Sequence, residues 1–244
     1  MLIDRQVRNA VAVQKWIEEE LNEIPRTNPP KKILDAGAGE CKNKKYCGHL
    51  EYISQDLCEY GGKGNGKGLQ RNKWDTSKID IVCDIRDMPI NSDMFDIVLC
   101  SEVLEHVYKP EEAIKEMARV LKQGGIMLLT APFCSLTHFA PYHYSTGFNV
   151  YWYRKVLEDN GCRIVSELPI GNFFDYLRQE IGRVPYVKRQ FGEGGGNSVL
   201  DKFMIGFINE WLFHCGRKDR SSSQILCFDY CIKAEKANRL DSDK

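Results

Sequence analysis

The chain has 244 residues, 43% of them hydrophobic, and its 34 basic residues balance 34 acidic ones. Because these charges cancel, no long-range field draws the chain to nucleic acid or anionic lipid, and a polynucleotide substrate is disfavoured. The length suits one domain that buries about 70–75% of the surface its unfolded form would expose.

Ten cysteines are scattered along the chain, and no pair has the C-x-x-C spacing of a metal site. They indicate reduced, mostly buried thiols, and the sequence predicts no metal centre. The N-terminal stretch MLIDRQVRNAVAVQKW carries charges and lacks an apolar run, so it resembles neither a signal peptide nor a membrane anchor. We therefore expect a cytoplasmic protein.

Short runs rich in β-branched residues alternate with helix-period segments from about residue 31 onward. This order is typical of an α/β protein with a parallel sheet wrapped by helices. A helix precedes the sheet and ends at Pro25, and another begins at Pro110 and is expected to stop at Gly124-Gly125. The seven expected strands are residues 31–37, 50–57, 78–85, 94–101, 125–132, 162–170 and 224–236.

Further helices are expected over residues 151–161, 172–191 and 198–215. The last two are inserted before the final strand, and the apolar run at 198–215 is too short and too often interrupted by charge to span a bilayer. Their aromatic residues need cover, by packing in the core, by capping a ligand pocket, by a homodimer face or by a membrane surface. The chain then forms a single domain, 1–244, with an N-terminal helix (1–30), a core (31–160) and C-terminal strands with a helical cap (161–235).

Acidic residues and glycines mark the predicted strand ends. In ILDAGAGE the first strand ends at Asp35 and enters Gly37-x-Gly39, where missing side chains let a ligand approach the backbone. A tight turn alone is the alternative, and a dinucleotide fingerprint would need a third glycine where the chain has Lys42.

Three more acids follow the next apolar runs, namely Asp56, Asp84 and Glu102. A carboxylate after the second strand suits the hydroxyls of a ribose, and one after the third can accept from an adenine amino group. Each acid alone is more often a cap or turn residue. Together, in this order, they predict an adenosine site.

These stretches resemble the class I S-adenosylmethionine-dependent methyltransferases, and more closely their type 11 branch. The similar pieces are ILDAGAGE, YISQDL, DIVCDIRDMPINSDMFDIVLCSEVLEHV and MARVLKQGGIMLLTAPF, within about residues 31–160. The resemblance implies a Rossmann-like sheet of seven mostly parallel strands and S-adenosylmethionine as cofactor. It implies these contacts: Asp35, Gly37 and Gly39 with the methionine end, Asp56 with the ribose, Asp84 and the Ile85 backbone with the adenine, and Ser101 and Glu102 beneath the sulfonium.

The glycine run GGKGNGKG (61–68) lies between the second and third expected strands. It is no phosphate-binding P-loop, because GK[ST] is absent and no helix follows it directly. We expect a flexible lid beside the adenosine, with Lys63, Lys67 and Arg71 able to meet an anionic acceptor. A solvated loop without contacts is the alternative.

The candidate catalytic residues follow the fourth and fifth strands. His106, in SEVLEHV, is a candidate general base, and a structural histidine is the alternative. His138, Tyr142 and His143 lie in THFAPYHYSTGFNVYWY, whose mixture of polar and apolar rings fits a pocket for a sugar or small ring, or a plain core edge. A base is needed only for a neutral hydroxyl or a protonated amine.

A small-molecule acceptor is predicted, because the fourth strand lacks the D/N-P-P-Y/F motif of amino-directed DNA enzymes and no Pro-Cys nucleophile appears. The stretch from GKGLQ through LTAPFCSLTHFAPYHYSTGF looks like that of methyltransferases encoded with bacterial capsule and other surface-polysaccharide genes. This likeness implies a carbohydrate, phosphoryl or phosphoramidate acceptor, methylated on oxygen or nitrogen. An NAD-dependent oxidoreductase and a non-catalytic binding domain stay open as alternatives.

Overall fold

The computed structural model describes residues 7–71, 73–192 and 198–238. Its strands are β1 (Lys32–Ala36), β2 (Glu51–Asp56), β3 (Ile81–Val82), β4 (Phe95–Ser101), β5 (Leu121–Pro132), β6 (Cys162–Ile170) and β7 (Asp229–Lys236). Its α-helices are α1 (Val7–Asn22), α2 (Pro110–Val120), α3 (Val150–Asp159), α4 (Phe173–Phe191) and α5 (Val199–Gly216), with short 3-10 turns η2 (Lys44–Tyr46), η3 (Leu104–His106) and η4 (Ser222–Gln224).

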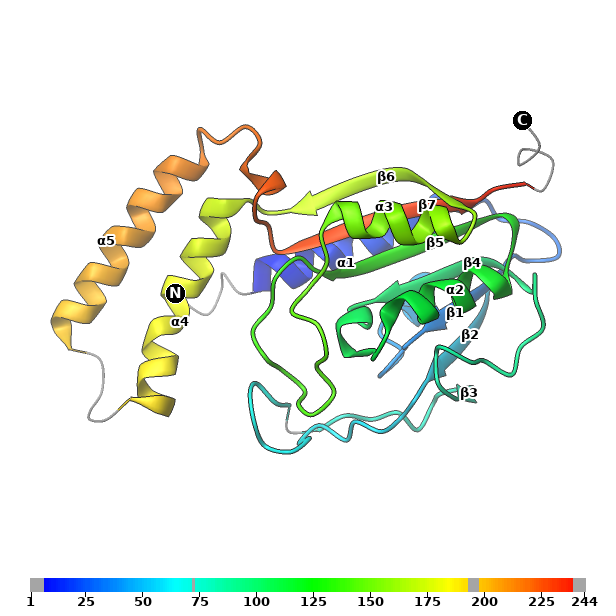
Figure 1. Cartoon of the computed structure of the whole chain (residues 1–244), viewed down its shortest axis with the longest axis horizontal. Helices are drawn as coiled ribbons and strands as arrows, with labels where there is room; N and C mark the ends of the chain where they lie inside the picture. The colour runs from blue at the N-terminus through cyan, green and yellow to red at the C-terminus, as the bar shows by residue number, and fades with distance from the viewer. Residues whose placement is uncertain (1–6, 72, 193–197, 239–244) are drawn as a thin grey trace. The chain divides into compact units, whose positions relative to one another are not determined.

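The strands form one seven-stranded sheet in the order β3-β2-β1-β4-β5-β7-β6 (Figure 1). Strand β1 pairs in parallel with β2 on one side and β4 on the other, and β4 pairs in parallel with β5. In Figure 1, β7 runs opposite to β5 and β6. The strand order reverses direction at β1 and β4, and ligands of such sheets bind beside the carboxyl ends at that point. The predicted α/β class and mostly parallel sheet are confirmed.

The middle strands are covered on both faces, which explains their continuous apolar sequence. Leu34 and Val98 are fully buried at neighbouring positions of β1 and β4. In the view of Figure 1, α2 and α3 lie in front of the sheet, and the part of α1 from Val13 onward lies behind it. Helix α2 buries Ile114 and Met117 and exposes its charged face, so it is amphipathic with its apolar side on the sheet.

Strand β3 is much shorter than the expected run of residues 78–85. The Asp80 carboxylate accepts from the backbone N–H of Ser54 at 2.9 Å and from its hydroxyl at 2.7 Å. A side chain thus takes the hydrogen bond that a neighbouring strand would otherwise make, and only Ile81 and Val82 pair with β2.

The glycine pair at 124–125 does not end α2. The helix stops at Val120, because Leu121 has an extended backbone and already begins β5. The register of β5 against β4 then shifts between Phe95 and Ile97, and the glycines lie in this irregular part of the strand.

The chain divides into two compact units. The first, Val13–Leu168 with Tyr230–Lys244, holds the core of the sheet, and the second, Met1–Ala12 with Pro169–Asp229, holds α4 and α5. In the second unit Lys188 and Asp201 pair at 2.6 Å across the two helices. No helix among the described residues is long and apolar enough to cross a membrane.

Helix α5 keeps an apolar face in contact with solvent. Phe203, Phe207 and Trp211 are 68%, 65% and 59% exposed, whereas Tyr176 of α4 is buried beside Phe228. The expectation that these aromatic rings pack in the core is therefore wrong for α5. The other three alternatives, a cap over a ligand pocket, a homodimer face and a membrane surface, stay predictions.

The ten cysteines are all free thiols, but only five of them are buried. The buried thiols are Cys47, Cys100, Cys162, Cys227 and Cys231, and the other five are half-buried. The expectation of mostly buried cysteines is thus met for half of them.

Candidate functional site

The turn after β1 forms the centre of the candidate site. Gly37 and Gly39 have φ values of +75° and +51°, which favour glycine. A Cβ atom on Gly37 would lie 2.4 Å from a methyl group of Val103, so no side chain fits there. The N–H groups of Gly37 and Ala38 donate to the Gln55 carbonyl at 2.8 and 2.9 Å, which fastens the turn to β2.

Asp56, at the end of β2, lies against this turn as predicted. One of its carboxylate oxygens accepts from the N–H of Gly39 at 2.9 Å, and the other accepts from the N–H of Cys58 at 2.8 Å. An ionised carboxylate offers about four lone-pair sites, so about two remain for hydroxyl donors. The side chain is half-buried, and it can both hold the turn and meet a ligand.

Asp35 lies beneath the turn rather than on its surface. Its carboxylate is 1% exposed and accepts from the Tyr52 hydroxyl at 2.7 Å. Burial raises the pKa of Asp35 from 3.8 to about 6, although the bonds from Tyr52 and Asn43 oppose the change. Burial and the Asp35 carboxylate also raise the pKa of Tyr52, so its phenol keeps the proton that it donates. In this arrangement Asp35 supports the turn from below.

Asp84, after β3, is held by an arginine that the sequence analysis did not single out. The Arg86 guanidinium donates to both Asp84 oxygens, at 2.6 to 3.1 Å, and these bonds lower the pKa of Asp84. The neighbouring Ile85 side chain is buried. Asp84 is therefore ionised and fixed at the edge of the sheet. The sequence signal for its partner was the presence of an arginine two residues later.

Gln55 is a second residue that the sequence analysis missed. Its buried side chain accepts from the Gly37 N–H at 3.2 Å and donates to the Cys83 carbonyl at 2.6 Å. It thus joins the turn after β1 to the end of β3. The amide side chain inside the predicted strand YISQDL was the available signal, because a buried amide requires hydrogen-bond partners.

The ends of β4 and β5 carry a directed chain of hydroxyl groups. Thr130 donates to the Glu102 carboxylate at 2.8 Å, so Ser101 is the donor in its 2.9 Å bond to the Thr130 hydroxyl. Glu102 has a φ of +56°, a strained value for a residue with a side chain, and such strain is concentrated at functional sites. Glu102 is exposed at this edge, as its predicted role requires, and Thr130 is its unpredicted support.

The structure gathers the predicted histidines. The ring centroids of His106 and His138 are 4.6 Å apart, and those of His138 and His143 are 4.7 Å apart. The Nδ1 atom of His106 lies 2.6 Å from the Tyr142 carbonyl oxygen, so Tyr142 contributes its backbone there. Burial, and then the nearby His138, lower the pKa of His106 to about 3. The prediction of a suitably tuned base at His106 is therefore not supported.

Aromatic side chains from two loops meet over the turn. We call Tyr60, Trp74 and Phe139 the aromatic group. The rings of Tyr60 and Phe139 stack with centroids 4.5 Å apart, and the Phe139 ring also stacks on His106 at 5.1 Å. A Cβ atom on Gly39 would lie 2.6 Å from the Trp74 ring. The aromatic group therefore reaches the glycine turn from the side of the histidines.

The glycine run belongs to the insert between β2 and β3, residues 57–80, and it is docked rather than free. The Leu69 N–H donates to the Thr137 carbonyl at 3.0 Å, and the Phe139 N–H donates back to the Leu69 carbonyl at 2.9 Å. In Figure 1 the cyan insert and the green loop after β5 lie side by side. The insert is thus a layer bonded to that loop, with Lys63 and Lys67 exposed on it.

Substitution of Gly64 tests this docking. A Cβ atom on Gly64 would lie 2.0 Å from the Ala140 carbonyl oxygen, whereas one on Gly66 would meet nothing within 4 Å. Both residues have positive φ, so both alanine variants carry backbone strain of about 1 kcal/mol. We expect Gly64→Ala, but not Gly66→Ala, to make the insert sensitive to limited proteolysis. Equal cleavage of the two variants would contradict the docked arrangement.

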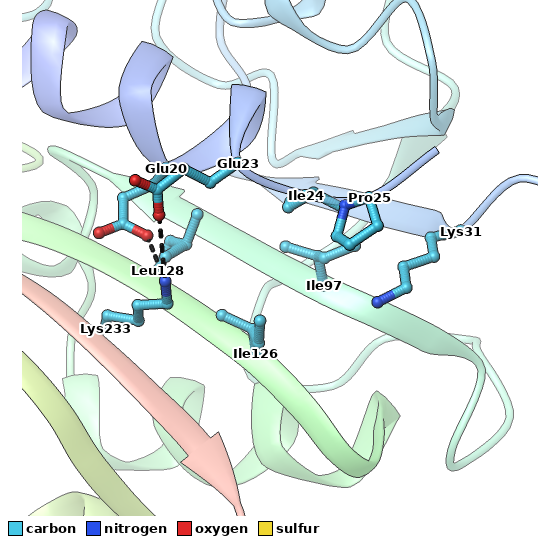
Figure 2. Close-up of a pocket in the computed structure, with 9 residues that line it drawn as sticks. All are labelled: Glu20, Glu23, Ile24, Pro25, Lys31, Ile97, Ile126, Leu128 and Lys233. Carbon is cyan, nitrogen blue, oxygen red and sulfur yellow. Dashed lines mark ion pairs between the residues drawn. The ribbon is translucent and has the colours of Figure 1, made fainter. Parts of the chain in front are cut away.

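A small pocket elsewhere in the first unit is not the candidate site. It has a volume of about 100 Å³ and is lined by α1 and by the central strands, with Lys233 paired to Glu20 at 2.6 Å (Figure 2). Pockets that hold a cofactor or another small molecule usually measure about 300–1,000 Å³. Its strand residues Ile97, Ile126 and Leu128 lie before the carboxyl ends of β4 and β5. The pocket is therefore away from the edge of the sheet where the predicted acidic residues lie.

Comparison with known proteins gives consistent matches. A family model described as a methyltransferase domain matches residues 34–129. The chain is 31% identical over 197 residues to a ubiquinone biosynthesis O-methyltransferase of Coxiella burnetii, covering 77% of this chain and 70% of that protein. It is 24% identical to a sarcosine/dimethylglycine N-methyltransferase of Halorhodospira halochloris, covering 72% of this chain and 66% of that one.

A solved structure has the same fold. The crystal structure of a SAM-dependent methyltransferase from Archaeoglobus fulgidus superposes with a TM-score of 0.53 and 18% identity, covering 91% of this chain and 94% of that one. At this identity the likeness concerns the fold alone. The sequence relatives methylate oxygen in one case and nitrogen in the other, as their names state, so they do not fix the acceptor atom.

Proposed function

Because this chain belongs to the class I S-adenosylmethionine-dependent methyltransferases, we propose that it methylates an oxygen of a small-molecule acceptor held beside the aromatic group. When bound, the cofactor supplies an electrophilic methyl group on a sulfonium. The chain's part is then to position the acceptor oxygen in line with that methyl group, and orientation alone contributes up to about 7–11 kcal/mol in favourable cases.

The edge of the sheet fits this cofactor in the following way. The turn at Gly37 and Gly39 lets the chain pass close to Val103 and Trp74 where a side chain would clash, and Gly37 stays half-buried at the edge. Asp56 keeps lone pairs for ribose hydroxyls, and Asp84, ionised beside Arg86, can accept from an adenine amino group. We assign Glu102 to the cationic end of the cofactor, because an exposed carboxylate favours a nearby positive charge.

The acceptor proposal depends on one observation: aromatic and imidazole rings from two separate loops meet over the glycine turn. Tyr60 and Phe139 are stacked and half-buried, and His106 continues the stack. A flat apolar surface edged by imidazole and phenol groups suits the face of a sugar ring, and the exposed Lys63 and Lys67 suit a phosphoryl substituent. We therefore propose a carbohydrate or phosphorylated carbohydrate as the acceptor. The likeness to methyltransferases encoded with capsule genes supports a role in bacterial surface-polysaccharide synthesis, and the ten free thiols support a cytoplasmic location, where thiols stay reduced.

A phenol is the second candidate. The relative with 31% identity is named for ubiquinone biosynthesis and O-methylation. A planar ring would lie against the same stack of aromatic rings as a sugar, and its hydroxyl would meet the same imidazole groups.

A panel of acceptors tests the proposal. Nucleotide sugars, sugar phosphates and catechols are offered with radiolabelled S-adenosylmethionine, and transfer to one class is expected. In the Phe139→Ala variant the acceptor KM should rise up to about tenfold while the Kd for S-adenosylhomocysteine stays unchanged, since Phe139 holds Tyr60 and His106 in the stack and an aromatic pair contributes up to about 1.5 kcal/mol. Tyr151→Ala, on an exposed ring of α3, is the matched control. Equal effects of the two substitutions would contradict the assigned acceptor surface.

A further inference from the structure

Three side chains with metal-ligating atoms converge beside the aromatic group. Glu105 and His106 lie on η3 after β4, and His138 lies in the loop after β5. One ligand atom from each residue lies within 4.8 Å of the others. The Nε2 atoms of His106 and His138 are 3.6 and 3.8 Å from the same Glu105 carboxylate oxygen.

Both imidazole rings are oriented through their other nitrogen. The Nδ1 atom of His106 is 2.6 Å from the Tyr142 carbonyl oxygen, and that of His138 is 2.9 Å from the Leu136 carbonyl oxygen. A carbonyl oxygen only accepts, so Nδ1 carries the hydrogen in each bond. In the neutral ring, Nε2 then presents its lone pair to Glu105. Metal-ligating histidines are usually held in this way, by a bond from the second ring nitrogen to a carbonyl or carboxylate.

This convergence favours a positive charge between the ligand atoms. Two imidazole lone pairs facing a carboxylate oxygen repel one another, and Glu105 is 1% exposed, so water screens the repulsion weakly. A bound cation relieves this repulsion by accepting a lone pair from each of the three side chains.

The donor set indicates the class of cation. Magnesium and calcium prefer oxygen ligands, whereas two imidazoles and one carboxylate suit zinc and the neighbouring divalent transition metals. Tetrahedral ligands at about 2.1 Å from zinc are about 3.4 Å from one another. The observed 3.6 and 3.8 Å are close to this distance, and the third pair of ligand atoms, which lies within 4.8 Å, moves together when the ion binds.

We propose that Glu105, His106 and His138 bind one divalent transition-metal ion of the zinc class, and that this ion holds the acceptor hydroxyl. The second part rests on the proposed function. Three protein ligands leave a coordination position open, as in catalytic zinc sites. The bound hydroxyl loses its proton to water more readily. Its oxygen then forms the O–CH₃ bond as the S–CH₃ bond breaks, with S-adenosylhomocysteine as the leaving product.

Metal binding is measured directly on the full chain after treatment with a chelator and dialysis. Cobalt(II) is titrated by visible absorption and zinc chloride by calorimetry, and one ion per chain is expected. His138→Gln changes a half-buried loop residue and should weaken zinc binding at least tenfold, and Glu105→Gln should do the same. His214→Gln removes an exposed histidine, paired with Glu210 on α5, and should leave the affinity unchanged.

The titration of S-adenosylhomocysteine separates this inference from the proposed function. Loss of zinc affinity in His138→Gln, with the Kd for S-adenosylhomocysteine unchanged, supports the metal site. Zinc affinity equal in wild type, His138→Gln and Glu105→Gln overturns it, even if the protein methylates its acceptor. If zinc binds at this site but the methyl-transfer rate is the same with and without metal, the role in holding the acceptor is overturned. Failure to bind S-adenosylhomocysteine contradicts the proposed function and leaves the zinc result to be judged alone.

Discussion

Replacing Asp56 with alanine should weaken binding of S-adenosylhomocysteine about ten- to a hundredfold, or by roughly 1.5–3 kcal/mol. The substitution removes a charged acceptor that we assign to the ribose hydroxyls. It also frees the N–H groups of Gly39 and Cys58, which both donate to this carboxylate, so the turn itself loses support. The two effects act in the same direction, and calorimetric titration measures their sum.

Two further variants separate these contributions. Asp56→Asn keeps one carbonyl acceptor and should lose less affinity than Asp56→Ala. Asp159→Ala removes an exposed acid that pairs with Lys155 on α3, outside the candidate site. This variant should bind S-adenosylhomocysteine as tightly as wild type. If folded Asp56→Ala binds S-adenosylhomocysteine as tightly as Asp159→Ala, then Asp56 does not belong to the site.

The free energy of unfolding should depend on pH through Asp35. Its pKa is about 6 in the folded chain and 3.8 as its ordinary value, because burial disfavours the charged form. Between these values the native state binds more protons than the unfolded state, so stability falls as the pH rises. The stabilisation of the folded state by protonated Asp35 is complete below pH 3.8 and lost above about pH 6. At about 1.4 kcal/mol per pKa unit, the difference is about 3 kcal/mol.

The variant Asp35→Asn isolates this effect. Its amide oxygen can still accept from Tyr52, but it carries no charge at any pH. We expect it to be more stable than wild type at pH 7.5, by up to about 3 kcal/mol, and close to wild type near pH 4. Urea unfolding of both proteins across this pH range measures the difference between their free energies of unfolding. The other titrating groups are the same in both proteins, so their contributions cancel in this difference. A difference that does not change with pH would show that Asp35 is not a buried acid with a raised pKa.

The order of the helices and strands was predictable from sequence, because the spacing of hydrophobic residues differs between the two kinds of element. The strands expected at 31–37, 50–57 and 94–101 form within a residue or two of those bounds. Boundaries set by contacts between distant residues were not predictable. Asp80 shortens β3 by bonding to Ser54, and the extended backbone of Leu121 ends α2 ahead of its glycines.

The candidate site was predictable where local sequence places an acid after a strand, as at Asp56, Asp84 and Glu102. Its supports were less visible, since Gln55 and Thr130 bond across strands that are adjacent only in the folded sheet. The docked insert and the pairing of Glu105 with His138 likewise join segments that the sequence separates by tens of residues. Spacing within one motif therefore could not reveal them.

The central claim is that the carboxyl edge of β1, β2 and β4 binds S-adenosylmethionine. Calorimetric titration of the purified chain with S-adenosylhomocysteine, and separately with NAD, tests it most directly. The account predicts micromolar binding of S-adenosylhomocysteine, weakened in Asp56→Ala, and no binding of NAD. Binding of NAD alone, or of neither ligand, would contradict the account.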